Sequence, residues 1–324
     1  MNPKTRNSHR PAGSHSIADA LSLLHIPEKR FPRLLLYTDY LRKQVFGRRI
    51  SLCAIINARS GRCSEDCAFC AQSGHWSARI KEYGLVSRDN ILSAAHKAEE
   101  MHARRFSIVT SGKGLSSPDD QTEVLSAVEA IRRESGLLPC ASLGIVDLGF
   151  LRRLKDAGLE RYHHNLETAP SFFPKICTTH DYEEDMEVIR LAREAGLETC
   201  CGGIFGMGET WDQRIEFILT LRDLEVDAIP INFLNPIPGT PLSSRALLDP
   251  FECLKIIAFF RILIPGRSLI ICGGREVNLG ELQDWVFLAG ADGLMIGDYL
   301  TTKGRSVADD LQMLKDKGLE PMSP

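Results

Sequence analysis

Three cysteines of this chain lie close together, at a spacing that suits an iron–sulfur cluster. Cys63, Cys67 and Cys70 form the pattern C-x3-C-x2-C. Three thiolates on one short loop can each bind one iron of a [4Fe–4S] cubane, which leaves the fourth iron open to a substrate. A structural zinc site normally has four protein ligands, whereas this triplet has no partner pair, although His75 is near in the sequence. The spacing therefore predicts a cluster, with a zinc site and unligated thiols as the less favoured alternatives.

The composition is that of an ordinary globular protein. Of the 324 residues, 44% are hydrophobic and 25% are charged. A net charge of −3 gives no electrostatic indication of a nucleic-acid partner. The sequence has no apolar stretch of membrane-spanning length and no apolar core of a signal peptide. Ten cysteines without a secretion signal favour a cytoplasmic protein whose thiols serve metal or redox chemistry.

Short apolar or β-branched segments alternate regularly with amphipathic stretches through most of the chain. Eight β–α units over about 250 residues are typical of a (β/α)8 barrel. An open, doubly wound sheet is the alternative, but no G-x-G-x-x-G follows the first predicted strand. Residues 110–114 fit a strand-end turn better than a phosphate-binding loop. The predicted strands are 52–57, 105–112, 139–144, 161–168, 198–205, 228–234, 268–274 and 293–297.

Helix signals separate the predicted strands. Ser117 and Asp249 each precede a proline at the first position of a helix, and Thr210 begins a capping box with Gln213. Residues 1–16 are polar and predicted to be disordered, and a helical region follows to about residue 46. We therefore expect an α/β fold, a TIM-type (β/α)8 barrel over 47–324 with an N-terminal helical extension over 1–46. The predicted helix ends are marked by Gly158, Gly196 and Gly290.

Further cysteines lie on the predicted strands. Active sites of such barrels lie at the C-terminal ends of the strands, so the cysteine loop after the first strand belongs to that face. If Cys140, Cys200 and Cys272 on later strands all point inward, their thiols meet in the lumen and predict a second metal site. A free cysteine is otherwise a small hydrophobic packing residue. Cys53 and Cys253 are assigned to packing. Cys177 is a weak candidate for the active face.

Several segments resemble biotin synthases of the radical S-adenosylmethionine (SAM) superfamily. The resemblance runs in order from about residue 40 to the C-terminus and is carried by 57–73, 163–168, 200–210, 230–232 and 274–276. It implies that Cys63, Cys67 and Cys70 hold a [4Fe–4S] cluster whose open iron is chelated by SAM. It also implies that a 5′-deoxyadenosyl radical abstracts hydrogens from dethiobiotin, and that an auxiliary iron–sulfur cluster donates the inserted sulfur.

The resemblance also implies roles for single residues. Phe69 would pack beside the cluster near SAM, and Glu167 would hold the ribose hydroxyls, because a carboxylate can accept from both. Asn165 and Asn232 would hold SAM and the ureido ring of dethiobiotin through their amides. The segment that would support the adenine carries Gly202, Ile204, Gly206 and Glu209.

The chain departs from the family pattern at the auxiliary cluster. Ser107 and Ile270 stand where the family has a cysteine and an arginine, and Cys272 and Cys201 are additional thiols. We hypothesise a remodelled cluster, of the [2Fe–2S] or [4Fe–4S] kind, held by Cys140, Cys200, Cys272 and Cys201. Cys201 is the least secure of these, because strand alternation turns it away from its neighbour. His163 also replaces an asparagine that lies near the substrate in the family.

Other assignments stay open. Another radical SAM enzyme on the same barrel, such as a hydrogenase-cofactor maturase or a methylornithine synthase-like mutase, is the main alternative. Lipoyl synthases carry a second cysteine triplet near the N-terminus, and this chain has no cysteine before Cys53. A non-enzymatic iron–sulfur scaffold would not need Glu167 and Glu209. The resemblance further implies reduced flavodoxin or ferredoxin as electron donor and a homodimer, without nucleic acid or membrane.

Overall fold

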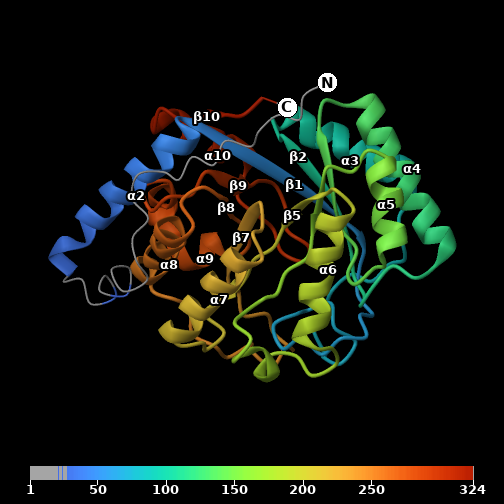
Figure 1. Ribbon diagram of the computed structural model, residues 1–324, viewed down its shortest axis with the longest axis horizontal. Coiled ribbons are helices and arrows are strands. Elements are labelled where there is room, and N and C mark those ends of the chain that lie inside the picture. The colour runs from blue at the N-terminus through green and yellow to red at the C-terminus, as the bar shows by residue number, and fades with distance from the viewer. Residues whose placement is uncertain (1–20, 22–23, 25–27, 324) are drawn as a thin grey trace.

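The computed structural model describes residues 21, 24 and 28–323, which contain a closed barrel of parallel strands wrapped by helices (Figure 1). The predicted arm at 1–16 and the beginning of the predicted N-terminal helix lie outside the described residues. Pairing of the first and last barrel strands closes the barrel, which confirms the predicted fold and excludes the open sheet. The barrel strands are β1 (Arg49–Arg59), β2 (Arg105–Thr110), β3 (Leu138–Ser142), β4 (Arg161–His163), β5 (Glu198–Cys200), β6 (Gly203–Phe205), β7 (Ala228–Phe233), β8 (Ser268–Ile271) and β9 (Gly293–Met295).

Helices follow the strands and cover the outside of the barrel. The predicted caps form: Ser117 Oγ accepts a hydrogen bond from the Asp120 amide, and Thr210 and Gln213 cap each other. The helix before the barrel packs on α8 through Phe31 and Phe251, whose ring centroids are 5.6 Å apart. The α-helices are α2 (Phe31–Phe46), α3 (Arg88–Glu100), α4 (Pro118–Glu134), α5 (Leu148–Asp156), α6 (Tyr182–Glu194), α7 (Trp211–Asp223), α8 (Pro250–Leu263), α9 (Arg275–Leu279) and α10 (Val307–Asp316).

Three features differ from the sequence prediction. The fourth strand, predicted over 161–168, ends at His163. The fifth predicted strand is interrupted at Cys201 and Gly202, between β5 and β6. A Cβ atom at Gly203 would lie 2.2 Å from the carbonyl oxygen of Glu167, so only glycine allows these two backbones to meet. The chain end adds β10 (Glu320–Pro321), which pairs in parallel with the start of β1. A strand of two residues has no periodicity from which it could be predicted.

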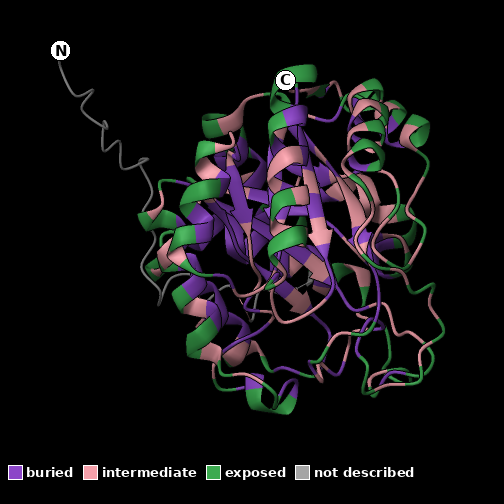
Figure 2. Ribbon diagram, turned by 90° about the vertical axis from the view of Figure 1, so that its right-hand side faces the viewer, coloured by how far each residue is buried: buried purple, intermediate pink, exposed green. Residues whose placement is uncertain are grey.

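The interior of the protein has two apolar regions. The larger lies between the strands and the surrounding helices, where Figure 2 shows buried strands beneath helices that are exposed on their outer faces. A smaller one lies inside the barrel and differs in character, because it is rich in thiols. Its buried members are Cys200, Ala228, Ile270 and Cys272, and Cys53 and Met295 pack against them.

A buried ion pair fixes the last barrel strands. Asp292 accepts hydrogen bonds from Arg261 Nη2 at 2.6 Å, Ser268 Oγ at 2.7 Å and the Leu269 amide at 2.7 Å. We expect Asp292→Ala to lower the free energy of unfolding by about 3–5 kcal/mol, because it leaves the charge of Arg261 buried and unpaired. Denaturant unfolding measures this, and a loss within about 0.5 kcal/mol, as at an ordinary surface position, would contradict it.

Candidate active site

The cysteine triplet lies on the loop that leaves the C-terminal end of β1. The Cys70 amide donates to the Cys67 carbonyl at 3.0 Å, and the Gly74 amide donates to the Cys63 carbonyl at 2.7 Å. These turns curl the loop so that all three thiols line one cavity. The structure thus brings the predicted triplet together at the face where the active site of such a barrel lies.

The cavity has a volume of about 450 Å³ and runs from the cysteine loop into the barrel lumen. Its wall also includes Phe69, Glu167 and Ile204, as well as Asn165 and Asn232. A volume of this size is sufficient for small-molecule ligands. The predicted substrate and cofactor residues therefore meet the predicted metal ligands in one continuous space.

Four lumen thiols line the inner part of this cavity, from Cys53, Cys140, Cys200 and Cys272. Strand register explains why they share a face. Cys53 on β1 is opposite Met295 on β9, and both pack against the small lumen cluster of thiols. Cys53, which the sequence analysis assigned to packing, thus lies in the wall of the cavity beside the other thiols.

Cys201 does not belong to this set, which corrects the predicted ligand group. Its side chain is fully buried in the main core rather than in the lumen. It follows Cys200 directly, so alternation along the strand turns it to the opposite face, and the interruption after β5 does not reverse it. Cys53 takes the fourth inward position that had been assigned to Cys201.

Burial controls the protonation of the lumen thiols. It raises the pKa of Cys200 to about 12. It also raises the pKa values of Cys53 and Cys140, and that of Cys272 well above the ordinary range. The metal-free thiols are therefore neutral at physiological pH, and metal binding must release their protons.

The lumen contains polar atoms without partners, which tests whether it suits a metal cluster. Among the described residues, Arg105 Nη1 and Ser107 Oγ are buried and make no hydrogen bond. Both residues line the cavity beside the thiols. Buried polar atoms without partners are rare in native proteins and indicate a missing ion, water or ligand. Thiolates and sulfides could accept from both donors, so the lumen suits an iron–sulfur cluster.

Two buried arginines provide positive charge near the same thiols. Arg105 Nη2 and Arg161 Nη2 donate to Glu198 Oε2 at 2.9 and 2.8 Å. One carboxylate shared by two guanidinium groups leaves the lumen with an excess of positive charge. That excess would offset the negative charge of a thiolate-ligated cluster. The sequence analysis missed both residues, since an arginine at the first position of a strand gives no site signal.

Glu167 lies in the cavity at the end of β4 with an unusual backbone. Its φ is 63°, in the left-handed region, and its carbonyl accepts from the Ile204 amide at 2.8 Å. Asn165 Nδ2 donates to its carboxylate at 3.3 Å. Burial raises the pKa of Glu167 to about 8. An unstrained residue is not expected to adopt this φ, and such strain is often found at functional sites.

Asn232 and His163 face the inner part of the cavity. The amide of Asn232 is oriented by the backbone: Nδ2 donates to the Gly203 carbonyl at 3.2 Å, and Oδ1 accepts from the Gly273 amide at 3.0 Å. Burial lowers the pKa of His163 to about 4, so its imidazole is neutral at pH 7. A neutral imidazole offers one hydrogen-bond donor and one acceptor, just as the amide of an asparagine offers an N–H donor and a carbonyl acceptor.

Glu209 has a structural role in the adjacent turn. Its carboxylate accepts from the amides of Gly206 and Gly208, each at 3.0 Å, and from Arg214 Nε at 2.8 Å. Unlike Ile204, neither Glu209 nor Gly206 nor Gly202 lines the cavity. The predicted adenine-supporting segment therefore presents Ile204 to the cavity, while Glu209 holds the turn behind it.

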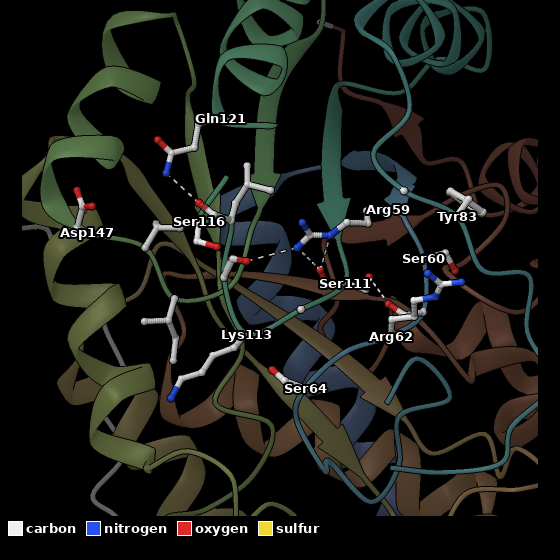
Figure 3. A pocket seen from close by; sticks show the side chains of 17 residues that line it. Arg59, Ser60, Arg62, Ser64, Tyr83, Ser111, Lys113, Ser116, Gln121 and Asp147 are labelled. Carbon is white, nitrogen blue, oxygen red and sulfur yellow. Dashed lines mark hydrogen bonds between the residues drawn. The ribbon is translucent and has the colours of Figure 1, made fainter. Parts of the chain in front are cut away.

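A second cleft of about 880 Å³ adjoins the cysteine loop at Ser64. Figure 3 shows Arg59, Arg62 and Lys113 around it, together with Ser64 of the loop. Arg62 is 85% exposed and pairs with Glu82 at 2.9 Å, and Lys113 pairs with Glu184 at 3.1 Å. Arg59 likewise pairs with Asp120, so three cationic side chains, each paired with a carboxylate, lie around the cleft next to the loop of the triplet. Among the described residues, no helix is long and apolar enough to cross a membrane.

Family comparisons cover most of the chain. The radical SAM superfamily matches residues 58–221, and the biotin and thiamin synthesis associated domain matches residues 230–320. A biotin synthase of Geotalea uraniireducens is 50% identical over 93% of this chain and 92% of its own length. A biotin synthase of Geobacter sulfurreducens is 52% identical over 88% of this chain and 87% of its own length.

Solved structures share the fold at lower identity. A methylornithine synthase superposes with a TM-score of 0.82 at 19% identity, over 94% of this chain and 93% of that protein. The FeFe-hydrogenase maturase of Carboxydothermus hydrogenoformans superposes with a TM-score of 0.78 at 18% identity, over 93% and 74% of the two chains. At these identities the likeness concerns the fold alone, whereas the biotin synthases match in sequence along nearly the whole chain.

Proposed function

The chain belongs to the biotin synthase family of the radical SAM superfamily, and from this premise we propose that it converts dethiobiotin to biotin. The observation that carries the proposal is the single cavity that joins the Cys63, Cys67 and Cys70 loop to the lumen thiols. Sulfur insertion needs a radical generator and a sulfur donor on either side of one substrate. The methylornithine synthase and the hydrogenase maturase match this chain in fold alone.

The outer part of the cavity would bind the radical-generating groups. A [4Fe–4S] cluster at the triplet, with SAM on its open iron, would supply one-electron cleavage of SAM and a radical that abstracts hydrogen. Phe69 would pack against SAM, and Asn165 and Glu167 would hold it by hydrogen bonds. Glu167 is already aimed by Asn165 and by the backbone of Ile204, so SAM would meet a fixed acceptor. Burial of the whole space would keep water from the reacting carbons.

The middle of the cavity would bind the ureido ring of dethiobiotin. Two of the hydrogen-bonding positions of Asn232 are used by backbone groups, and one N–H and one acceptor position remain for a ligand. Neutral His163 would add a donor and an acceptor from β4. A neutral imidazole thus explains how histidine can replace the asparagine of the family pattern without placing a charge beside the ring.

The inner part of the cavity would hold the auxiliary cluster. We assign Cys53, Cys140, Cys200 and Cys272 as its ligands, in place of the set with Cys201. Four thiolates compensate for Ser107 and Ile270 at the family's ligand positions. Such a cluster would supply the sulfur, and Arg105 Nη1 and Ser107 Oγ would donate to it.

Anaerobic turnover tests the proposed reaction. The reconstituted protein is incubated with SAM, a reductant and dethiobiotin, and biotin and 5′-deoxyadenosine are measured by mass spectrometry. We expect both products. Formation of 5′-deoxyadenosine without biotin would retain the radical chemistry and reject dethiobiotin as substrate.

An acidic one-electron donor, such as a reduced flavodoxin or ferredoxin, would dock at the second cleft, where it would compete with the carboxylate partners of Arg59, Arg62 and Lys113. We expect Arg62→Glu to raise the KM for flavodoxin about tenfold at low salt, with a smaller effect at high salt, because rim charges act mainly on association. Reduction by dithionite should be unchanged. The matched control is Arg222→Glu at the end of α7, where the exposed arginine pairs with Asp223. Equal effects of the two variants would contradict this docking site.

The working form would be a cytoplasmic homodimer. Leu36 and Tyr40 lie one turn apart on α2 and are exposed to 66% and 55%, which offers an apolar surface for a second copy. Light scattering after size-exclusion chromatography would measure the mass, and a single-chain mass at micromolar concentration would reject the dimer.

A further inference from the structure

Three side chains that the proposed reaction does not use converge beside the cysteine loop. The ligand atoms of Glu65, Cys177 and His180 all lie within 4.8 Å of one another. Cys177 Sγ is also 3.9 Å from Cys67 Sγ. The three side chains offer one sulfur, one imidazole nitrogen and one carboxylate oxygen, and Cys67 adjoins Cys177 with a second sulfur. These are the atoms that bind zinc and ferrous iron in proteins.

Backbone and side-chain bonds hold the two segments of this group together. The Ala68 amide donates to the Ile176 carbonyl at 2.8 Å, which joins the cysteine loop to the loop after β4. The carboxylate of Asp66 accepts from the Thr178 amide at 2.8 Å. One main-chain bond and the Asp66 carboxylate thereby place Cys67 and Cys177 opposite each other.

Glu65 and Cys177 both lie within reach of one ring nitrogen of His180. His180 Nδ1 lies 2.6 Å from Glu65 Oε2 and 3.3 Å from Cys177 Sγ. One ring nitrogen carries at most one proton, so it cannot donate to both acceptors at once. A single divalent ion would satisfy the nitrogen, the sulfur and the carboxylate together.

The two distances that involve sulfur agree with tetrahedral coordination, whereas His180 Nδ1 and Glu65 Oε2, 2.6 Å apart as in a hydrogen bond, would have to separate to about 3.3 Å around a zinc ion. Two sulfurs at about 2.3 Å from a zinc ion lie about 3.8 Å apart in a tetrahedron. The observed separation of Cys67 Sγ and Cys177 Sγ is 3.9 Å. A sulfur and a nitrogen at zinc distances lie about 3.6 Å apart, against the observed 3.3 Å between Cys177 Sγ and His180 Nδ1. A disulfide would instead require the sulfurs to approach to about 2.05 Å.

The second nitrogen of the imidazole has the partner that metal-bound histidines usually have. His180 Nε2 lies 3.2 Å from Asp185 Oδ2, and His164 Nε2 lies 2.7 Å from Asp185 Oδ1. A carboxylate on the far side of a histidine fixes the tautomer and leaves the other nitrogen free for a metal. Asp185 is buried, so this orientation is held within the protein.

We propose that Cys67, Cys177, His180 and Glu65 form a mononuclear site for a divalent ion, zinc or ferrous iron, with Asp185 as a positioning residue. The site shares Cys67 with the triplet. An ion there and a cluster at the triplet would therefore compete for one thiolate, and only this competition rests on the proposed function. The site would therefore bind its ion in the chain before the cluster at the triplet is assembled.

A cobalt titration tests the site without any enzymatic activity. The full chain carrying Cys63→Ala and Cys70→Ala is used, because its triplet can no longer hold a cluster. Under anaerobic conditions we expect one Co2+ per chain, with the strong visible bands of four-coordinate cobalt and thiolate-to-metal bands in the near ultraviolet. Cys177→Ser in this background should reduce the near-ultraviolet intensity by half and weaken binding by at least about tenfold. A weak, six-coordinate spectrum, or a spectrum unchanged by Cys177→Ser, would overturn the proposal.

Further variants separate a metal site from a folding effect. Asp185→Asn should weaken cobalt binding about 10–100-fold and leave the thiolate bands in place, because it acts through His180. Cys253→Ser removes a buried thiol in α8 and should change neither. If Cys177→Ser loses its helical circular dichroism, His180→Gln is used instead, and undiminished binding in that variant would also overturn the proposal.

Zinc and ferrous iron should compete for the proposed site. Zinc should displace the bound cobalt at lower concentration than ferrous iron, following the general order of affinities. In the cluster-free wild-type chain, bound zinc should slow iron incorporation during reconstitution, and Cys177→Ser should remove most of that delay. A delay of equal size in both chains would show that the triplet alone holds the zinc, and it would overturn the competition.

Discussion

Replacing Cys53 with serine is expected to abolish biotin formation while SAM cleavage continues. Cys53 lies on β1 in the lumen, beside the thiols of Cys200 and Cys272, and its thiol is buried by the barrel. As a proposed direct ligand of the auxiliary cluster it should matter more than a residue that only orients a ligand, whose loss costs about 10–100-fold. Biotin formation should fall by more than about a hundredfold, and the iron content should drop to that of one cluster per chain.

The matched control for this variant is Cys201→Ser. Cys201 is also fully buried on the interrupted fifth strand, but it packs in the main core outside the lumen. We expect it to retain the iron content and the product ratio, with only a loss of stability. Iron analysis, Mössbauer spectroscopy and product ratios distinguish the two variants. Loss of the auxiliary iron in Cys201→Ser, and its retention in Cys53→Ser, would restore the ligand set predicted from the sequence.

Glu167→Ala is expected to lower kcat/KM for SAM by at least about a hundredfold. The two ribose hydroxyls would each donate to this carboxylate, and a hydrogen bond to a charged group contributes about 1.5–3 kcal/mol. Loss of two such bonds exceeds the roughly 2.7 kcal/mol that corresponds to a hundredfold. Kinetics at saturating dethiobiotin measure the change. The matched control is Glu129→Gln on the exposed face of α4, which should leave kcat/KM unchanged.

The pH dependence of SAM binding should report the same carboxylate. Burial raises the pKa of Glu167 to about 8, so the group is mostly protonated at pH 7 in the free protein. If the ionised form accepts both hydroxyls, SAM affinity should rise up to about tenfold for each pH unit below 8 and level off above it. Glu167→Gln should bind SAM with no such slope. A slope that persists in Glu167→Gln would assign the titration to another group.

The chain carries enough local information to predict the barrel. Short-range structure is determined by eight apolar segments, by the N-cap residues Ser117 and Thr210, and by glycines at helix ends. The barrel strands begin where these signals indicate. The cysteine triplet is equally local, because its three thiols lie within one loop. Its spacing alone could therefore predict where a cluster would be held.

The set of lumen thiols was decided by the tertiary structure. Cys53, Cys140, Cys200 and Cys272 lie on four strands that are far apart in the sequence, and only the closed barrel brings them to one cavity. Both faces of a parallel barrel strand are apolar, so the sequence has no polar alternation to show which face is inward. For this reason the sequence left Cys53 to packing, whereas strand alternation already indicated that Cys201 turns away from Cys200.

The pairing of Cys67 with Cys177 and His180 has the same origin. These residues lie on two loops, after β1 and after β4, and a main-chain hydrogen bond between Ala68 and Ile176 joins them. Neither loop has a motif that indicates the other. The sequence by itself thus determined the elements and the local cluster loop, because those depend on neighbours along the chain. The contents of the lumen and the contacts between loops depend on barrel closure and strand register, which only the tertiary structure decided.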